Sequence, residues 1–76
     1  MSKKQIIIED IEAGDAVEWY DNGFRCDNVI DIKKGISTLD KDWVVTERYG
    51  DILIGIIKKV MVRKDGKLTD KLLEKE

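Results

Sequence analysis

Residues 14–25, GDAVEWYDNGFR, decide the fold of this chain. Asn22 and Gly23 tolerate the positive φ angles of a two-residue type I′ turn, so they predict a tight β-hairpin. Val17 and Trp19 precede the turn at a spacing of two, which places both side chains on one face of a strand. The stretch therefore predicts a β-structure whose core begins at these two residues.

The strand after the turn, predicted over 24–33, alternates apolar and charged residues. Its apolar positions share one face: Phe24, Cys26, Ile30 and Ile32. We expect this set to join Trp19 in the core, because a register shift of one residue would expose all of it. Cys26 is then a small inert hydrophobe rather than a reactive thiol. Val29 interrupts the charged face, which indicates contact on both sides of the strand or a nearby bulge.

Three further strands are predicted, at 43–48, 52–57 and 60–64. The segment 52–57 is the most apolar, and its apolar residues on both faces predict a central, covered strand. Residues 68–76 are predicted to be a C-terminal tail. The tail either forms a short docked helix, with Thr69 as its N-cap, or it frays.

Length and composition bound the architecture. The chain has 76 residues, of which 42% are hydrophobic and 39% are charged, so it holds one domain with a small core. Ile and Val dominate the apolar set, which favours strands. A sheet in so short a chain hides its edges by curling on itself. The sequence therefore predicts a mainly all-β domain over 1–67, a small barrel of five to six strands, followed by the tail over 68–76.

Charge is unevenly distributed along the chain. Residues 1–31 carry three basic and eight acidic side chains, a net charge of −5, whereas residues 32–76 carry eleven basic and eight acidic ones, a net charge of +3. Two interpretations stay open. The two regions attract each other in the folded protein, or the charges are ordinary solvated surface between core residues.

Cellular location is indicated by two features. The single cysteine, Cys26, cannot form an internal disulfide, which fits a reducing cytoplasm. Near the N-terminus only residues 6–8 are consecutively apolar, which is too short for a signal peptide or a membrane span. We expect a cytoplasmic protein that does not contact a membrane.

The residue inventory argues against an enzyme. The chain has no histidine, so it lacks an imidazole base and a histidine metal site, and one cysteine cannot build a structural zinc site. It has neither a Gly-x-Gly-x-x-Gly loop nor a calcium-binding loop pattern. A small barrel filled by its own side chains rarely provides a catalytic cleft. We therefore expect no catalysis, no cofactor and no metal.

A spaced set of turn and core residues recurs along the chain: Gly14-Asp15-x-Val17-x-Trp19, Gly23, Val29-x-x-Ile32, Trp43-Val44-Val45, Gly50-Asp51, Val60 and Val62. Across residues 11–63 this order resembles the SH3-like small barrels of the Tudor type. The resemblance implies a small barrel that binds ligands beside its hairpins. Two features depart from it. Residues 26–28 stand where such domains often carry a glycine, and the last strand is expected to follow Ile57 without the usual short helical turn.

All five aromatic residues lie within residues 19–49. In Tudor-type barrels, aromatics beside the hairpins form a cage for a methylated cation or a groove for a peptide, and a cation gains from the ring quadrupole. Alternation instead assigns Trp19 to the core, and we expect Trp43 to follow it. Tyr20 and Tyr49 are expected to be exposed, which is too few rings for a cage.

Two binding hypotheses follow. The first is a non-catalytic interaction module, of the kind found in small bacterial or phage accessory proteins, that contacts a protein partner through Tyr20, Arg25 and Tyr49. The second is a nucleic-acid-binding barrel that contacts phosphates through a basic segment: Lys58, Lys59, Arg63, Lys64 and Lys67. A pI near 5.2 favours the first. An exposed edge strand would in addition allow a weak homodimer.

Overall fold

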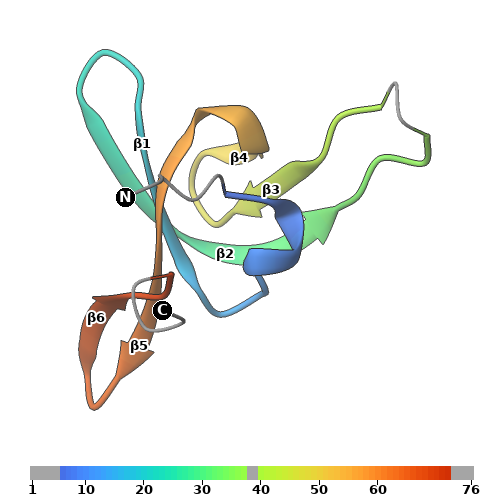
Figure 1. Ribbon diagram of the computed structural model, residues 1–76. Coiled ribbons are helices and arrows are strands. Elements are labelled where there is room, and N and C mark those ends of the chain that lie inside the picture. The colour runs from blue at the N-terminus through green and yellow to red at the C-terminus, as the bar shows by residue number, and fades with distance from the viewer. Residues whose placement is uncertain (1–5, 38–39, 73–76) are drawn as a thin grey trace, which may run out of the picture.

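The computed structural model describes residues 6–37 and 40–72, which form one antiparallel sheet of six strands (Figure 1). The strands are β1 (Ala16–Tyr20), β2 (Phe24–Lys33), β3 (Trp43–Thr46), β4 (Gly50–Leu53), β5 (Ile57–Lys64) and β6 (Lys67–Asp70). Two short 3₁₀ helices accompany them, η1 (Ile8–Asp10) and η2 (Ile54–Ile56). The order across the sheet is β4-β3-β2-β1-β5-β6. The prediction of a mainly β chain with five to six strands is confirmed.

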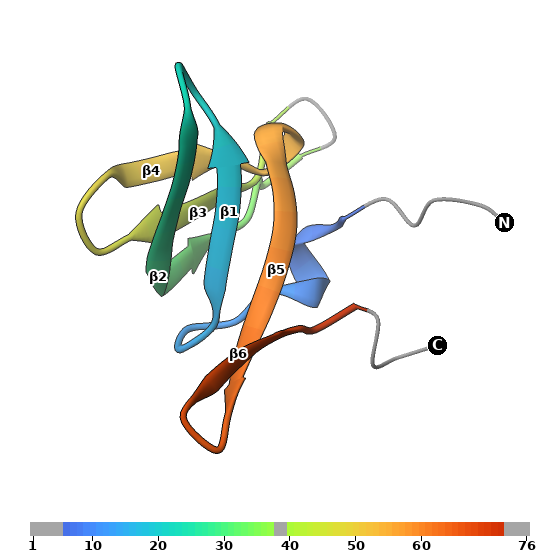
Figure 2. The same ribbon diagram turned by 90° about the vertical axis from the view of Figure 1, so that its left-hand side faces the viewer.

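Strand β2 bends the sheet on itself. Its first half pairs with β1 and its second half pairs with β3. Between these halves Val29 lies opposite Thr46 and Asp31 lies opposite Val45, so Ile30 is an extra residue, a β-bulge. Beyond the bend, β3 and β4 cross steeply over the direction of β1 and β5 (Figure 2). The bulge that Val29 indicated is present, and it folds the two halves around one core.

The hairpin at the start of β2 differs from the prediction by one residue. Asn22 and Gly23 do adopt positive φ angles, 57° and 126°. However, Tyr20 lies opposite Phe24, so the loop has three residues instead of two. Trp19 consequently pairs with Arg25, whereas a two-residue loop would pair it with Cys26. Because strand side chains alternate, this shift exchanges the two faces of β2.

The exchange of faces corrects most of the expected core of β2. Phe24 is 75% exposed, Ile30 is 54% exposed and Cys26 is also exposed, so none of the three belongs to the core. Asp27 and Val29 are buried in their place. Of the predicted set only Ile32 packs against the core, because the bulge returns it to the inner face.

The segment 52–57 is not the central strand that its composition predicts. Ile52 ends up near the C-terminal end of β4, at the edge of the sheet, and Ile57 begins β5. Both are buried, but η2 separates them. The apolar run therefore serves two strands and the helical turn between them. The sequence predicts that the last strand follows Ile57 without the short helical turn that is usual in Tudor-type barrels. That prediction is wrong, because the helical turn η2 precedes β5.

The core lies inside the bend of the sheet. Val17, Trp19, Val44 and Val60 are almost completely buried, which confirms the prediction for the first two. Residues 8–10 form η1, which helps to bring Ile8 and Ile11 into the core. The buried cluster is Ile8, Ile11, Val17, Trp19, Val29, Val44, Ile52, Ile57 and Val60. This small helical turn closes one side of the core that the sheet leaves open.

The C-terminal region continues the sheet. Residues 67–70 form β6 and pair with β5, so a helix capped by Thr69 is wrong there, and β6 crosses the predicted domain boundary after residue 67. Beyond the strand, the Lys71 amide donates to the Val60 carbonyl at 2.9 Å. The rest of the expected helix, 73–76, lies outside the described residues. None of the helices in the described residues has the length and apolar character needed to cross a membrane.

Candidate aromatic peptide site

One hollow of about 430 Å³ lies between the β1–β2 hairpin and the β4–η2 segment. We call it the aromatic hollow; its lining residues are Trp19, Asp21, Arg25, Trp43, Tyr49, Asp51, Ile52, Leu53 and Ile56. Three of these are large apolar residues that stay open to solvent, since Trp43 is 37%, Tyr49 is 47% and Ile56 is 40% exposed. Its volume falls in the range of ordinary ligand pockets, about 300–1,000 Å³.

The turn between β3 and β4 positions Tyr49. The Tyr49 amide donates to Thr46 Oγ1 at 3.2 Å, and that hydroxyl donates to the Gly50 carbonyl at 2.9 Å. Gly50 itself adopts a φ of 74°, as the glycine that closes a three-residue hairpin loop does. Asp27 on β2 holds the same turn, because its carboxylate accepts the Arg48 amide at 2.6 Å. Tyr49 is therefore fixed by strand pairing and by two buried side chains.

The rings and the cation of the hollow contact each other. The Tyr49 and Trp19 rings meet edge to face, with centroids 5.4 Å apart and planes at 87°. The Arg25 guanidinium carbon lies 5.8 Å from the centre of the Tyr49 ring, within the range of a cation–π contact. Because Trp19 is only 2% exposed, it supports the hollow from below, and Tyr49 and Trp43 form its accessible aromatic surface.

The charged residues around the hollow differ in whether they form ion pairs. Asp51 pairs with Lys33 at 3.1 Å in an exposed ion pair. Arg25 has no carboxylate partner among residues 6–37 and 40–72. Asp21 lies at the tip of the exposed β1–β2 loop. The hollow therefore offers a cation held against a ring, beside an apolar surface.

The structure separates the predicted protein-contact residues. Arg25 and Tyr49 come together in the aromatic hollow. Tyr20 is exposed as expected, but its side chain packs against Phe24 on the opposite face of the hairpin, with centroids 5.4 Å apart. Trp43, expected in the core, is the residue that sequence reasoning missed. The charged run 40–42 directly before it was the available signal, since such a run marks a strand end at the surface.

The predicted nucleic-acid contacts are all exposed but do not share one face. Lys64 lies opposite Lys67 beside the tip of the β5–β6 hairpin. Lys59 lies opposite Glu18, and Arg63 donates to the Asn28 side chain at 2.6 Å. Lys58 falls where the pairing of β5 with β1 shifts by one residue. The basic segment is thus divided between a basic hairpin tip and a mixed-charge face.

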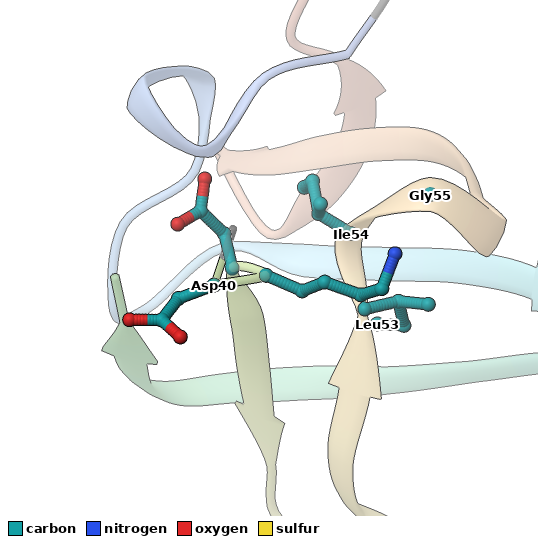
Figure 3. Close-up of a pocket in the computed structure, with 6 residues that line it drawn as sticks. Asp40, Leu53, Ile54 and Gly55 are labelled. Carbon is teal, nitrogen blue, oxygen red and sulfur yellow. The ribbon is translucent and has the colours of Figure 1, made fainter. Parts of the chain in front are cut away.

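A second hollow, of about 270 Å³, lies beyond the end of β4 (Figure 3). Its acidic residues already accept hydrogen bonds from the amides of the neighbouring loop. Asp40 accepts the amides of Ile36 and Ser37 at 3.1 and 3.2 Å, and Asp42 accepts the Gly35 amide at 2.7 Å. This hollow therefore reflects the shape of the loop. Leu53 lines both this hollow and the aromatic hollow.

Comparison of the chain with models of protein families, with curated proteins and with solved structures found no match.

Proposed function

We propose that this chain is a non-catalytic interaction module that binds a protein partner at the aromatic hollow. The observation that carries the proposal is the exposure of Trp43, Tyr49 and Ile56 around one concavity. Exposed aromatic and arginine side chains in a pocket are the usual anchors of protein interfaces. Here Trp43 and Arg25 lie on paired strands and Tyr49 lies in a hydrogen-bonded turn, so little conformational entropy is lost when a partner binds.

The module would be a small barrel of the SH3-like, Tudor type. The strand order and the helical turn before β5 support this assignment, as does the position of the hollow beside the β1–β2 and β3–β4 hairpins. The role that we infer for such a module is that of an accessory protein, of bacterial or phage type, that acts by occupying a partner in the cytoplasm.

Capture of partners by the tagged chain tests the proposal. Trp43→Ala and Tyr49→Ala each remove an accessible ring from the hollow, and we expect each to lose at least about tenfold in the recovery of a specific partner. Tyr20→Ala is the matched control, because it removes an exposed ring from the opposite face. Thermal unfolding of each variant checks that the fold survives. Partners that bind both hollow variants as well as the parent chain would contradict the proposal.

The basic hairpin tip supports a second candidate, nucleic-acid binding. Lys64 and Lys67 face each other on the β5–β6 hairpin, which extends away from the body of the sheet (Figure 2). A phosphate contact there would weaken with salt, because binding releases counterions. Titration of single-stranded and duplex oligonucleotides at several salt concentrations tests it. The double variant Lys64→Ala and Lys67→Ala should reduce both affinity and salt slope, and an unchanged slope would exclude the tip.

A further inference from the structure

The free edge of the sheet opens toward the aromatic hollow. The Ile54 amide donates to the Asp42 carbonyl at 3.1 Å, which sets the phase of the β3–β4 ladder. In an antiparallel pair the backbone groups of successive residues point alternately toward and away from the partner strand. Ile52 therefore bonds to β3, as Ile54 does to Asp42 just before it, whereas Asp51 and Leu53 turn their amides outward.

Three of these outward groups stay available. β4 is the last strand of the sheet, and within residues 6–37 and 40–72 the amides of Asp51 and Leu53 and the carbonyl of Asp51 have no hydrogen-bond partner. The Leu53 carbonyl is used, because Leu53 is the N-cap of η2 and accepts its first bond. Edge strands with free donors and acceptors can pair with an added strand.

The hollow borders β4 along most of the length of the strand. Three consecutive residues of β4 line it: Asp51, Ile52 and Leu53. Since side chains of a strand alternate between two faces, this run of three consecutive residues indicates that the hollow reaches the edge of β4. A chain placed there would meet the backbone of β4 and, in the hollow, the Trp43, Tyr49 and Ile56 side chains.

The residues that line the hollow limit which side chains a bound peptide would place there. Its lining accepts a large apolar or aromatic side chain. Arg25 has no carboxylate partner in the described residues and is held against the Tyr49 ring, so it is a preorganised partner for an acidic group. Asp51 is already paired with Lys33. Asp21 belongs to the loop tip.

We propose that the ligand is an extended peptide that adds a strand to the free edge of β4, with a large apolar side chain in the aromatic hollow and a neighbouring Asp or Glu on Arg25. This inference rests on the proposed function and specifies it. Backbone pairing supplies affinity, and the two side chains supply specificity.

A proline at position 53 tests the backbone pairing. Leu53 has a φ of −66°, close to the angle that proline fixes, and its amide does not bond to β3. Leu53→Pro therefore removes only an outward donor and the leucine side chain, and Leu53→Ala removes the side chain alone. We expect the proline variant to bind about tenfold more weakly than the alanine variant, because the peptide loses a hydrogen bond and meets the proline ring.

The probes are dodecamer peptides selected from a randomised phage-displayed library on the parent chain, labelled with fluorescein and titrated by anisotropy. We expect the selected sequences to place Trp, Phe, Tyr, Leu or Ile beside Asp or Glu. Replacing that acid by Asn or Gln should weaken binding to the parent chain by several-fold. The same replacement should have little effect on Arg25→Ala, because the charge partner is already absent.

The outcomes distinguish binding at the aromatic hollow from the more specific proposal of strand addition with an acidic contact. Equal affinities of Leu53→Pro and Leu53→Ala, with binding lost in Trp43→Ala, would overturn strand addition and leave the aromatic hollow as the binding site. Selected peptides without an acid, or an acid insensitive to Arg25→Ala, would overturn the charge assignment. Peptides that bind Trp43→Ala as well as the parent chain, or a selection that yields none, would overturn the site itself.

Discussion

Asp27 is the residue that most changes how β2 has to be understood. Its side chain has no exposed surface. Burial by itself would raise the pKa of this carboxyl, but hydrogen bonds from the Arg48 and Asn28 amides and from the Arg48 side chain outweigh it. The net result is a pKa below the ordinary value of 3.8. A charged group can thus occupy an inner position because the β3–β4 turn supplies its donors.

Asp27→Asn should destabilise the protein at neutral pH by about 1–3 kcal/mol, because buried amides lose a charged acceptor. The folded-state pKa lies below the unfolded-state value, so the stabilisation by the carboxylate is complete above about pH 4 and is lost as pH falls through the folded-state pKa. Urea unfolding followed by tryptophan fluorescence between pH 7 and pH 2 measures this. If the variant lost as much stability in acid as the parent chain, Asp27 would not be the group responsible.

Among the elements, the β1–β2 hairpin shows how loop length determines which side chains are buried. The sequence correctly predicts a turn at Asn22 and Gly23, but the loop includes Asp21 as well. The observed register buries Asp27 and exposes Phe24, against simple hydrophobic alternation. Its support comes from elsewhere in the fold: the Val29 amide donates to the Asp15 carbonyl at 2.8 Å, and the Gly14 amide donates to the Val29 carbonyl at 2.9 Å.

The reactivity of the Cys26 thiol tests this register directly. Because the thiol is exposed, we expect Ellman's reagent to modify it completely in the folded protein without denaturant. Partial burial and the nearby Glu18 and Asp27 carboxylates raise the pKa of Cys26, more than Arg48 and Arg63 lower it. The reaction at pH 8 should therefore be slower than that of an unfolded-chain thiol. A thiol that reacts only after unfolding would support the alternative register, with Cys26 in the core.

Glycine substitutions test the hairpin loop. Gly23 has a φ of 126°, which residues with a side chain rarely adopt, so Gly23→Ala should destabilise the protein by roughly 1 kcal/mol or more. Gly55→Ala is the control. Gly55 lies in η2, and an added methyl group there meets open space. We expect it to be neutral or stabilising by up to about 1 kcal/mol. Equal effects of the two substitutions in thermal unfolding would contradict the loop geometry.

At the scale of the whole molecule, the uneven charge of the chain has a structural counterpart. Ion pairs join the acidic N-terminal region to the basic C-terminal region: Glu9–Lys34, Glu12–Lys71, Asp15–Lys71 and Asp27–Arg48. Glu9–Lys34 joins two exposed groups, and Glu12–Lys71 and Asp27–Arg48 each include one exposed partner, which limits what these ion pairs contribute. Asp15–Lys71 is different, since its atoms are 2.6 Å apart and both side chains are largely buried. It ties the segment after β6 to the start of β1.

Lys71→Met should lower the free energy of unfolding by about 1–3 kcal/mol, because it leaves the buried Asp15 carboxylate without its cation. The matched control is Lys33→Met, which breaks the exposed pair with Asp51 and should change stability by no more than about 1 kcal/mol. Chemical denaturation of both variants measures the difference. A Lys71→Met variant as stable as the control would show that this pair does not hold the C-terminal segment.

The sequence by itself determined the β class, the approximate strand positions, the turn residues and the core role of Val17 and Trp19, because these follow from local propensity and spacing. It also indicated the bulge near Val29. These features need only neighbouring residues to be recognised. The exposed position of Tyr49 could be predicted in the same way, since it lies in a turn.

Only the tertiary structure decided which face of β2 is buried, how the apolar run 52–57 is divided and which rings remain accessible. Each depends on how distant segments come together: Asp27 bonds to the β3–β4 turn, η2 lies between two strands, and Trp43 and Arg25 both line the aromatic hollow. A one-residue change in a loop reverses every face of a strand. Local alternation cannot determine this choice, because the stabilising hydrogen bonds come from residues about twenty positions away.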